Sequence, residues 1–166
     1  MIIRRETAAD RPEIEAVIEA AFPEPVEVRL LRELFATREY IPELSLVAED
    51  ADGRIVGHVI STRGWIGETP ALGLGPIGVL PELQGQGIGS ALMRASIDAA
   101  TGLGEPAIVL LGSTEYYPRF GFVPADSVGI ISPDPSWGSH FMALPLPGFH
   151  PGIRGHFRYA EPFNDL

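Results

Sequence analysis

The sequence predicts a single α/β (α+β) domain over residues 1–166, with a mixed, mostly antiparallel sheet of about seven strands and helices on both faces. Two apolar runs flank an Asp-Gly turn at residues 50–53, a strong hairpin signal. A strand, a glycine-rich turn and a helix then follow one another over residues 72–100. The strands on either side of that helix should be parallel, because a helix joins them.

The N-terminal part predicts one short strand and two helices. Residues 2–6 favour a strand, and Thr7 with Asp10 has the spacing of a capping box. A helix should therefore run to about Phe22, and a second one should follow two prolines over residues 27–37. The apolar residues expected to be buried are Ile14, Val17, Ile18 and Ala21 in the first helix and Val28, Leu31, Leu34 and Phe35 in the second.

The middle of the chain predicts an antiparallel meander. Residues 44–49 and 55–60 are the strands of the hairpin, and a second turn at residues 67–70 leads into a strand at residues 71–80. Pro76 lies inside that last strand. Proline cannot donate to a sheet ladder, so Pro76 predicts a bulge or a parting of strands, or else an edge strand.

The glycine-rich segment at residues 84–89 precedes a helix predicted over residues 90–100. The first N–H groups of a helix have no internal partner, and glycines let an anion approach the backbone, so this layout predicts a phosphate cradle. The glycines fall as G-x-G-x-G, without the acidic residue expected about 20 positions later in a dinucleotide site. There is no G-K-S or G-K-T either, which excludes a nucleoside-triphosphate loop. A tight turn with packing glycines is the alternative.

The rest of the chain completes the sheet. Residues 107–111 form a fully apolar run of parallel-strand character. Residues 124–138 are rich in proline and glycine and predict a long loop, and residues 140–146 and 155–159 predict two short strands. His58 lies on an apolar strand and is expected to be a hydrogen-bonded core histidine rather than a base.

Composition excludes several functions. The net charge of −10 argues against nucleic-acid binding, which needs a positive surface. There is no cysteine, no apolar h-region after the first arginines and no run long enough to span a bilayer, so we expect a cytoplasmic protein without membrane contact. No H-E-x-x-H or similar spacing predicts a metal site, and no G-x-S-x-G predicts a serine hydrolase.

Two blocks resemble the GCN5-related N-acetyltransferase (GNAT) family. The acetyl-CoA signature Q/R-x-x-G-x-G/A is met by Gln84, Gly87 and Gly89. Some thirty residues later, Tyr117 stands four residues before Gly121-Phe122, as in the family's Y-x-x-x-G-F block. The variant L-L-G-x-x-x-Y-Y-x-R-F-G-F resembles, more narrowly, the YhbS-like subgroup of predicted acetyltransferases.

The resemblance implies a GNAT-like fold in which the fourth strand bulges and splays from the fifth, so that the pantetheine arm of acetyl-CoA enters the gap. It implies acetyl-CoA as co-substrate, no metal, and a small amine or a peptide amine as acceptor, with the protein a monomer or homodimer. The cofactor-binding residues that it implies are Ile77, Gly78, Val79, Gln84, Gly85, Gln86, Gly87, Ile88, Gly89, Ser90, Tyr117 and Phe120.

The reaction implied is direct attack of an amine on the thioester. The backbone N–H of Val79 would stabilise the oxyanion, and Tyr117 would be the general acid, because a phenol is protonated at neutral pH. Glu27 and Trp137 are candidate acceptor-binding residues. The general base stays open: Glu27 or Glu115 could act through water, or the amine could arrive deprotonated.

Two other classes of function remain open at this point. A non-catalytic sensor that binds CoA or acyl-CoA would keep the cradle without turning over any amine. A purely structural interaction domain would not bind acetyl-CoA at all.

Overall fold

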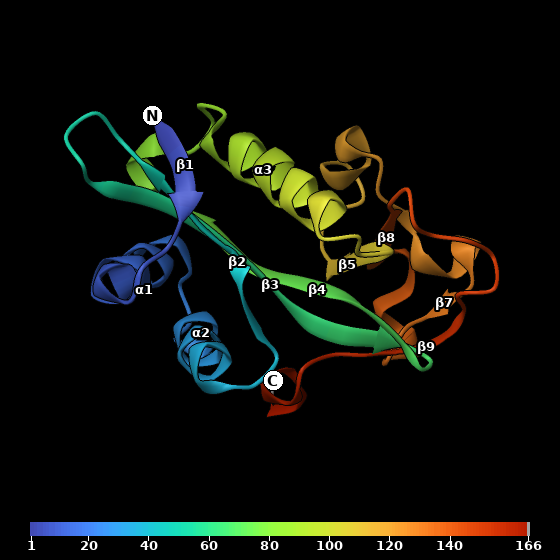
Figure 1. The fold of residues 1–166 in the computed structure, drawn as a ribbon. Coiled ribbons are helices and arrows are strands. Elements are labelled where there is room, and N and C mark those ends of the chain that lie inside the picture. The colour runs from blue at the N-terminus through green and yellow to red at the C-terminus, as the bar shows by residue number, and fades with distance from the viewer. Residues whose placement is uncertain (166) are drawn as a thin grey trace.

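A computed structural model describes residues 1–165. Three α-helices and nine strands form within this range, joined by short 3-10 turns (Figure 1). The helices are α1 (Arg11–Ala21), α2 (Val26–Ala36) and α3 (Ile88–Gly102). The strands are β1 (Ile2–Arg5), β2 (Tyr40–Glu49), β3 (Ile55–Ile66), β4 (Thr69–Val79), β5 (Ala107–Leu111), β6 (Val123–Pro124), β7 (Ile130–Ile131), β8 (Phe141–Pro145) and β9 (Gly155–Arg158).

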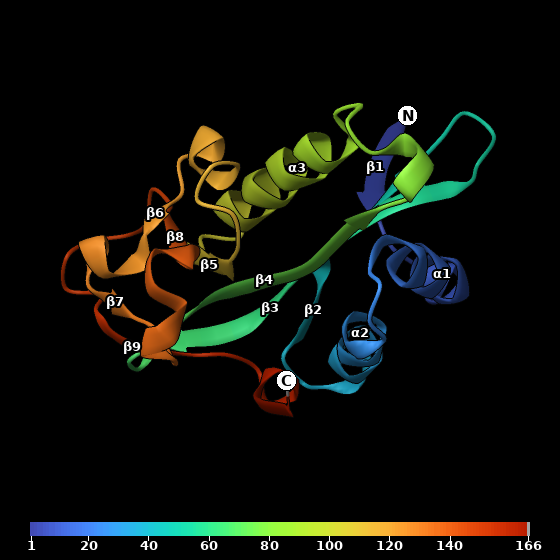
Figure 2. The ribbon, with the colours of Figure 1, turned by 180° about the vertical axis from the view of Figure 1, so that it is seen from behind.

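The sheet is mixed and mostly antiparallel, as predicted. Its order along the principal path is β1-β2-β3-β4-β5-β8-β6, with β9 added to β3 and β7 added to β9. Strands β4 and β5 are parallel, as expected from the helix that joins them. Helices α1 and α2 cover one face and α3 covers the other, so the predicted layers are confirmed (Figures 1 and 2).

Strand β4 carries the bulge that Pro76 predicts. Between the pairs Val59–Ile77 and Ser61–Leu74, β4 contains one residue more than β3. On its other side, β4 pairs with β5 only through Leu72–Ile108 and Gly73–Val109, and no further pair is formed among the described residues. The two strands therefore separate after residue 73, and the expected splay is present.

The first two helices form as the apolar spacing predicts, with small shifts at their ends. Asp10 accepts a hydrogen bond from the Thr7 backbone N–H at 2.7 Å, as in a capping box. In α1 the expected face is buried apart from Ala21, which is half-exposed. Helix α2 begins and ends one residue earlier than predicted and also buries Leu30, whereas Phe35 is half-buried.

The region predicted as a loop at residues 124–138 contains more structure than expected. It holds two short 3-10 helices and strand β7, which pairs with β9. The predicted strands at residues 140–146 and 155–159 form as β8 and β9. A second core of aromatic and apolar side chains lies beneath this region, centred on Phe141, Phe157 and Tyr159.

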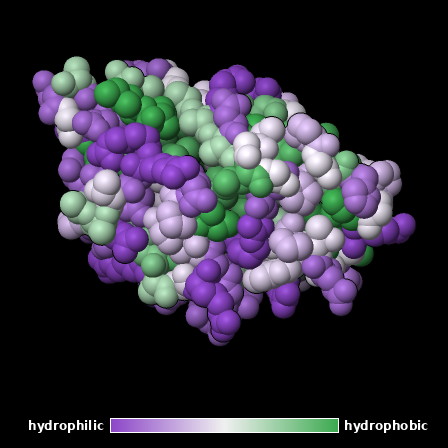
Figure 3. Space-filling model, viewed as in Figure 1, coloured by the Kyte–Doolittle hydropathy of each residue, from purple (hydrophilic) through white to green (hydrophobic). Residues whose placement is uncertain are grey.

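Much of the surface facing the viewer in Figure 3 is hydrophilic, and hydrophobic side chains are seen mainly at the upper left and near the middle of that face. No helix within residues 1–165 combines the length and apolar character that a membrane crossing requires.

Candidate active site

Helix α3 begins with backbone N–H groups that its own side chains leave free. Its N-cap is Gly87, at φ 88°, and no side chain caps the first turn. The first three N–H groups of a helix lack internal acceptors and carry the positive end of the helix dipole. Gly85 (φ 78°) and Gly87 have no heavy atom within 4 Å of where a Cβ would stand, so the space beside this turn is open. The residues present therefore fit a phosphate group.

A cavity of about 730 Å³ adjoins this helix end. The predicted residues that line it include Val79, the glycine-rich turn and Tyr117, so the structure brings most of the predicted cofactor residues together. Its lining comprises Val79, Leu83, Gln84, Gly85, Gly87, Ile88, Gly89, Ser90, Gly112, Ser113, Tyr116, Tyr117 and Arg119. We call it the α3 cavity.

Four predicted cofactor residues do not line the α3 cavity: Ile77, Gly78, Gln86 and Phe120. Gly78 turns the position of its missing Cβ towards α1, where it would meet Ile18 Cδ1 at 2.9 Å. Gln86 is exposed and does not line the α3 cavity. Phe120 packs edge-on against Tyr116, with ring centres 5.4 Å apart, and supports the cavity wall from behind. These positions follow from packing, which the motif spacing does not report.

The end of β4 presents backbone groups to the gap between β4 and β5. Leu80 N donates to Val56 O at 2.9 Å, so this pair is hydrogen-bonded across β3 and β4. Because antiparallel pairs alternate, the N–H and C=O groups of Val79 and Ile77 point away from β3, while those of Gly78 point towards it. The side-chain amide of Gln84 donates to Val79 O at 3.0 Å. The N–H groups of Ile77 and Val79 thus face the gap.

Tyr117 lies between two cavities. It lines the α3 cavity and also a second cavity beneath α2. Its ring packs against Phe122 and Tyr116, with centres 5.9 Å and 5.1 Å away. Burial is the main cause that raises the pKa of the Tyr117 phenol above its ordinary value, and repulsion from Tyr116 raises this pKa further. The group is therefore held protonated at neutral pH.

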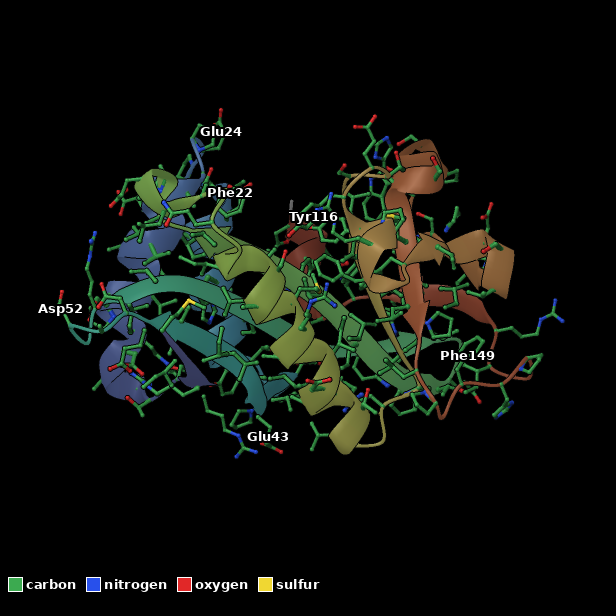
Figure 4. The ribbon with its side chains drawn as sticks, turned by 90° about the horizontal axis from the view of Figure 1, so that it is seen from above. Phe22, Glu24, Glu43, Asp52, Tyr116 and Phe149 are labelled. Atoms are coloured by element: carbon green, nitrogen blue, oxygen red, sulfur yellow. The ribbon has the colours of Figure 1, made fainter. Side chains whose placement is uncertain are left out.

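Five residues that line the α3 cavity escaped the sequence prediction: Leu83, Gly112, Ser113, Tyr116 and Arg119. Tyr116 and Arg119 make specific contacts there. The Tyr116 hydroxyl lies 3.1 Å from Ser90 Oγ and joins the loop after β5 to the first turn of α3. Figure 4 shows Tyr116 between α3 and the C-terminal third of the chain. Arg119 stacks on the Tyr116 ring at 4.3 Å and donates to Tyr116 O at 2.8 Å, which places a cation at this cavity. Both stand inside the block that contains Tyr117, which is the signal that could have indicated them.

The second cavity has a volume of about 540 Å³. We call it the α2 cavity. The predicted acceptor residues Glu27 and Trp137 both line it, as does Ile77. Most of the wall is aromatic or aliphatic, and it comprises Phe22, Glu27, Leu30, Leu74, Gly75, Pro76, Ile77, Leu110, Leu111, Tyr117, Pro133, Trp137, Phe157, Arg158, Tyr159, Phe163 and Asn164.

The ionisable groups near the gap are few. Glu27 Oε2 is shielded from solvent and has no hydrogen-bond partner among the described residues. Glu115, the other candidate base, is exposed and lines neither cavity. His58 is fully buried, with Nε2 2.9 Å from Ser45 Oγ, as expected of a core histidine. Within residues 1–165, no group of three or more acidic, histidine or cysteine side chains could hold a metal ion.

Comparison with known proteins identifies relatives of this chain. The chain is 35% identical over 162 residues to the uncharacterized N-acetyltransferase YjhQ of Escherichia coli (strain K12), covering 93% of this chain and 89% of YjhQ. It is 30% identical over 173 residues to the uncharacterized N-acetyltransferase YhbS of the same strain, covering 99% of each.

Solved structures agree. The crystal structure of YhbS from Escherichia coli in complex with CoA superposes with a TM-score of 0.91, at 28% identity, over 98% of this chain and 91% of YhbS. A GNAT family acetyltransferase from Brucella melitensis, in complex with acetyl-CoA, gives a TM-score of 0.79 at 34% identity, over 98% of this chain and 97% of that one. The family described as "Acetyltransferase (GNAT) family" matches residues 11–122, and the chain belongs to it.

Proposed function

We propose that the protein transfers an acetyl group from acetyl-CoA to a primary amine within a ternary complex. One observation carries this proposal: Tyr117 borders both cavities at the point where β4 parts from β5. A thioester placed in that gap would meet a cofactor-sized cleft on one side and an acceptor-sized cleft on the other.

The α3 cavity supports binding of acetyl-CoA. Its glycine turn and free helix N–H groups suit the diphosphate, and Arg119 adds a charge of the right sign. The N–H groups of Ile77 and Val79 suit the pantetheine amides, because they face the gap. The relatives YhbS, solved with CoA, and the Brucella melitensis protein, solved with acetyl-CoA, support the same assignment.

In the proposed reaction, the substrate ammonium first gives one proton to solvent through water beside the Glu27 carboxylate. The neutral nitrogen attacks the thioester carbonyl carbon, and the Val79 N–H stabilises the oxygen on which negative charge develops. The carbon–sulfur bond then breaks, and Tyr117 gives its proton to the departing sulfur. The amide nitrogen loses its extra proton, which returns through water to Tyr117. The products are an acetylated amine, CoA thiol and one proton in solution.

Release of CoA thiol tests this proposal. The chain contains no cysteine, so a thiol reagent reports CoA alone. The wild type should release CoA in proportion to added amine, and Tyr117→Phe should lower kcat about 100-fold while keeping its affinity for acetyl-CoA. Equal kcat values for wild type and variant would remove Tyr117 from the reaction.

The alternative function is a sensor that binds CoA or acyl-CoA without catalysis. The absence of an ionisable side chain on residues 72–79 favours it. A sensor would bind acetyl-CoA in a calorimetric titration and release no thiol with any amine. The same titration tests a purely structural domain, which would show no binding.

A further inference from the structure

The walls of the α2 cavity include six aromatic side chains drawn from distant parts of the chain. Phe22 comes from the end of α1, Trp137 from the segment before β8, and Tyr159 and Phe163 from the segment after β9. The Tyr159 and Phe163 ring centres lie 4.6 Å apart, and Trp137 lies 6.4 Å from Tyr159. Such a wall favours an apolar or aromatic ligand body over a polyhydroxylated one.

One carboxylate interrupts this apolar lining. Glu27 is the acidic residue among the described lining residues, and its Oε2 is buried without a partner. A buried polar atom without a hydrogen bond destabilises the folded state, and a carboxylate does so more than a neutral group. Because Glu27 lines the cavity, a ligand that places a cation beside its carboxylate would offset that cost.

The one basic side chain of the described lining does not compensate Glu27. Arg158 is exposed, and its guanidinium carbon lies 4.4 Å from the Trp65 ring centre. Trp65 is outside the lining of the cavity, and Arg158 forms no ion pair with Glu27 among the described residues. The interior therefore carries a net negative site within an apolar wall, which is complementary to a single positive charge.

We propose that the acceptor is a compact primary monoamine on an aromatic or apolar body, with its ammonium group at Glu27 and its body against Trp137, Tyr159 and Phe163. This substrate class rests on the proposed acetyltransferase function. A second charge on the ligand, whether the carboxylate of an amino acid or another ammonium of a polyamine, would be buried against apolar walls and would weaken binding. The volume of about 540 Å³ also excludes an acceptor of oligosaccharide size from full burial.

A panel of amines tests the class. We expect kcat/KM for 2-phenylethylamine to exceed that for spermidine, phenylalanine and kanamycin by at least about tenfold each. Turnover of spermidine, phenylalanine or kanamycin above that of 2-phenylethylamine would overturn the substrate class and leave the acetyltransferase function standing. Absence of turnover with every amine, with acetyl-CoA still bound, would overturn the function instead, and the class is then decided by binding alone.

Binding to the CoA-saturated protein supplies that second readout. In calorimetric titrations, 2-phenylethylamine should bind at least about tenfold more tightly than its uncharged counterpart 2-phenylethanol. Glu27→Gln should abolish this preference for the amine, because it removes the charge and keeps the shape of the side chain. Equal affinities for amine and alcohol in the wild type would overturn the proposal.

Glu24→Gln is the matched control. Glu24 lies three residues before Glu27, is exposed and points outward in Figure 4. It should keep the wild-type preference for the amine and the wild-type kcat/KM. Unchanged acetyl-CoA affinity in Glu27→Gln shows that the variant is folded. A preference that falls equally in both variants would mean that overall charge, and not the cavity, selects the amine.

Discussion

The side-chain amide of Gln84 donates a hydrogen bond to the carbonyl oxygen of Val79, with 3.0 Å between the two atoms. This bond ties the residue that opens the glycine-rich turn to the last residue of β4. The Val79 carbonyl oxygen therefore has a hydrogen-bond donor, while the Val79 N–H faces the gap. The glutamine of the signature thus has a structural role: it fixes the turn relative to the strand that should hold the thioester.

Removing that bond should weaken cofactor binding. Gln84→Ala frees the turn from β4, and we expect KM for acetyl-CoA to rise about fivefold to tenfold, in line with the loss of one hydrogen bond and some preorganisation. The value of kcat should change less than twofold at saturating acetyl-CoA. Steady-state kinetics with varied acetyl-CoA measure both.

Gln86→Ala is the comparison for Gln84→Ala. Gln86 is exposed, lies outside the described cavity lining, and should change KM for acetyl-CoA less than twofold. A larger effect at Gln86 than at Gln84 would show that the Gln84–Val79 bond does not organise the turn.

The packing of Tyr117 gives a second prediction. A Cβ on Gly112 would stand 2.4 Å from Tyr117 Cε2, a distance that forces the ring to move. Because a displaced ring would take the proposed general acid out of alignment, Gly112→Ala should lower kcat by at least about tenfold. Circular dichroism and a thermal melt should show that the fold persists.

Gly102→Ala serves as the reference for that variant. No heavy atom lies within 4 Å of a Cβ at Gly102, the last residue of α3. Its kcat should match the wild type. If Gly112→Ala also retained wild-type kcat, the position assigned to the Tyr117 ring would have no bearing on the reaction.

Short sequence patterns predicted most of the helices, strands and strand pairings. The Asp-Gly hairpin, the apolar faces of α1 and α2, and the parallel pair around α3 all depend on residues close together in sequence. Pro76 even indicated the bulge in β4, because proline has no N–H to give. These features follow from the side-chain pattern and the backbone chemistry of short stretches of sequence.

The composition of the two cavities could not be predicted in the same way. Phe163 reaches the α2 cavity only because the segment after β9 returns to α2, and Gly78 leaves the cofactor side because α1 packs against it. Tyr116 and Ser90 meet across 26 positions of sequence. Such contacts depend on tertiary packing, which neither spacing nor propensity encodes.

The raised pKa of Tyr117 gives a third prediction. A general acid must be protonated, and burial shifts its deprotonation above the ordinary phenol value of 10.0. The kcat measured at saturating substrates should therefore show no alkaline decline up to about pH 10. A decline centred near pH 8 to 9, absent from Tyr117→Phe, would assign Tyr117 a lowered pKa and contradict the environment described here.

The buried pair of His58 and Ser45 gives a fourth prediction, for stability. Burial lowers the pKa of His58 from 6.5 to about 3. Between these values the unfolded chain binds a proton at His58 that the folded chain does not, so the free energy of unfolding falls as pH decreases below 6.5. The slope due to this group should approach about 1.4 kcal/mol per pH unit.

Urea unfolding at about pH 5.0 and pH 6.5 measures this slope while staying above the ordinary pKa values of the carboxylates. The double variant Ser45→Ala with His58→Leu replaces both polar partners, whose atoms lie 2.9 Å apart, by apolar groups, so that neither partner is left buried without the other. Its stability should vary much less over the same interval, because the group that takes up the proton on unfolding is gone. Equal stability of the wild type at both pH values would mean that His58 takes up a proton as readily in the folded protein as in the unfolded chain. That result would contradict a pKa lowered by the complete burial of this side chain.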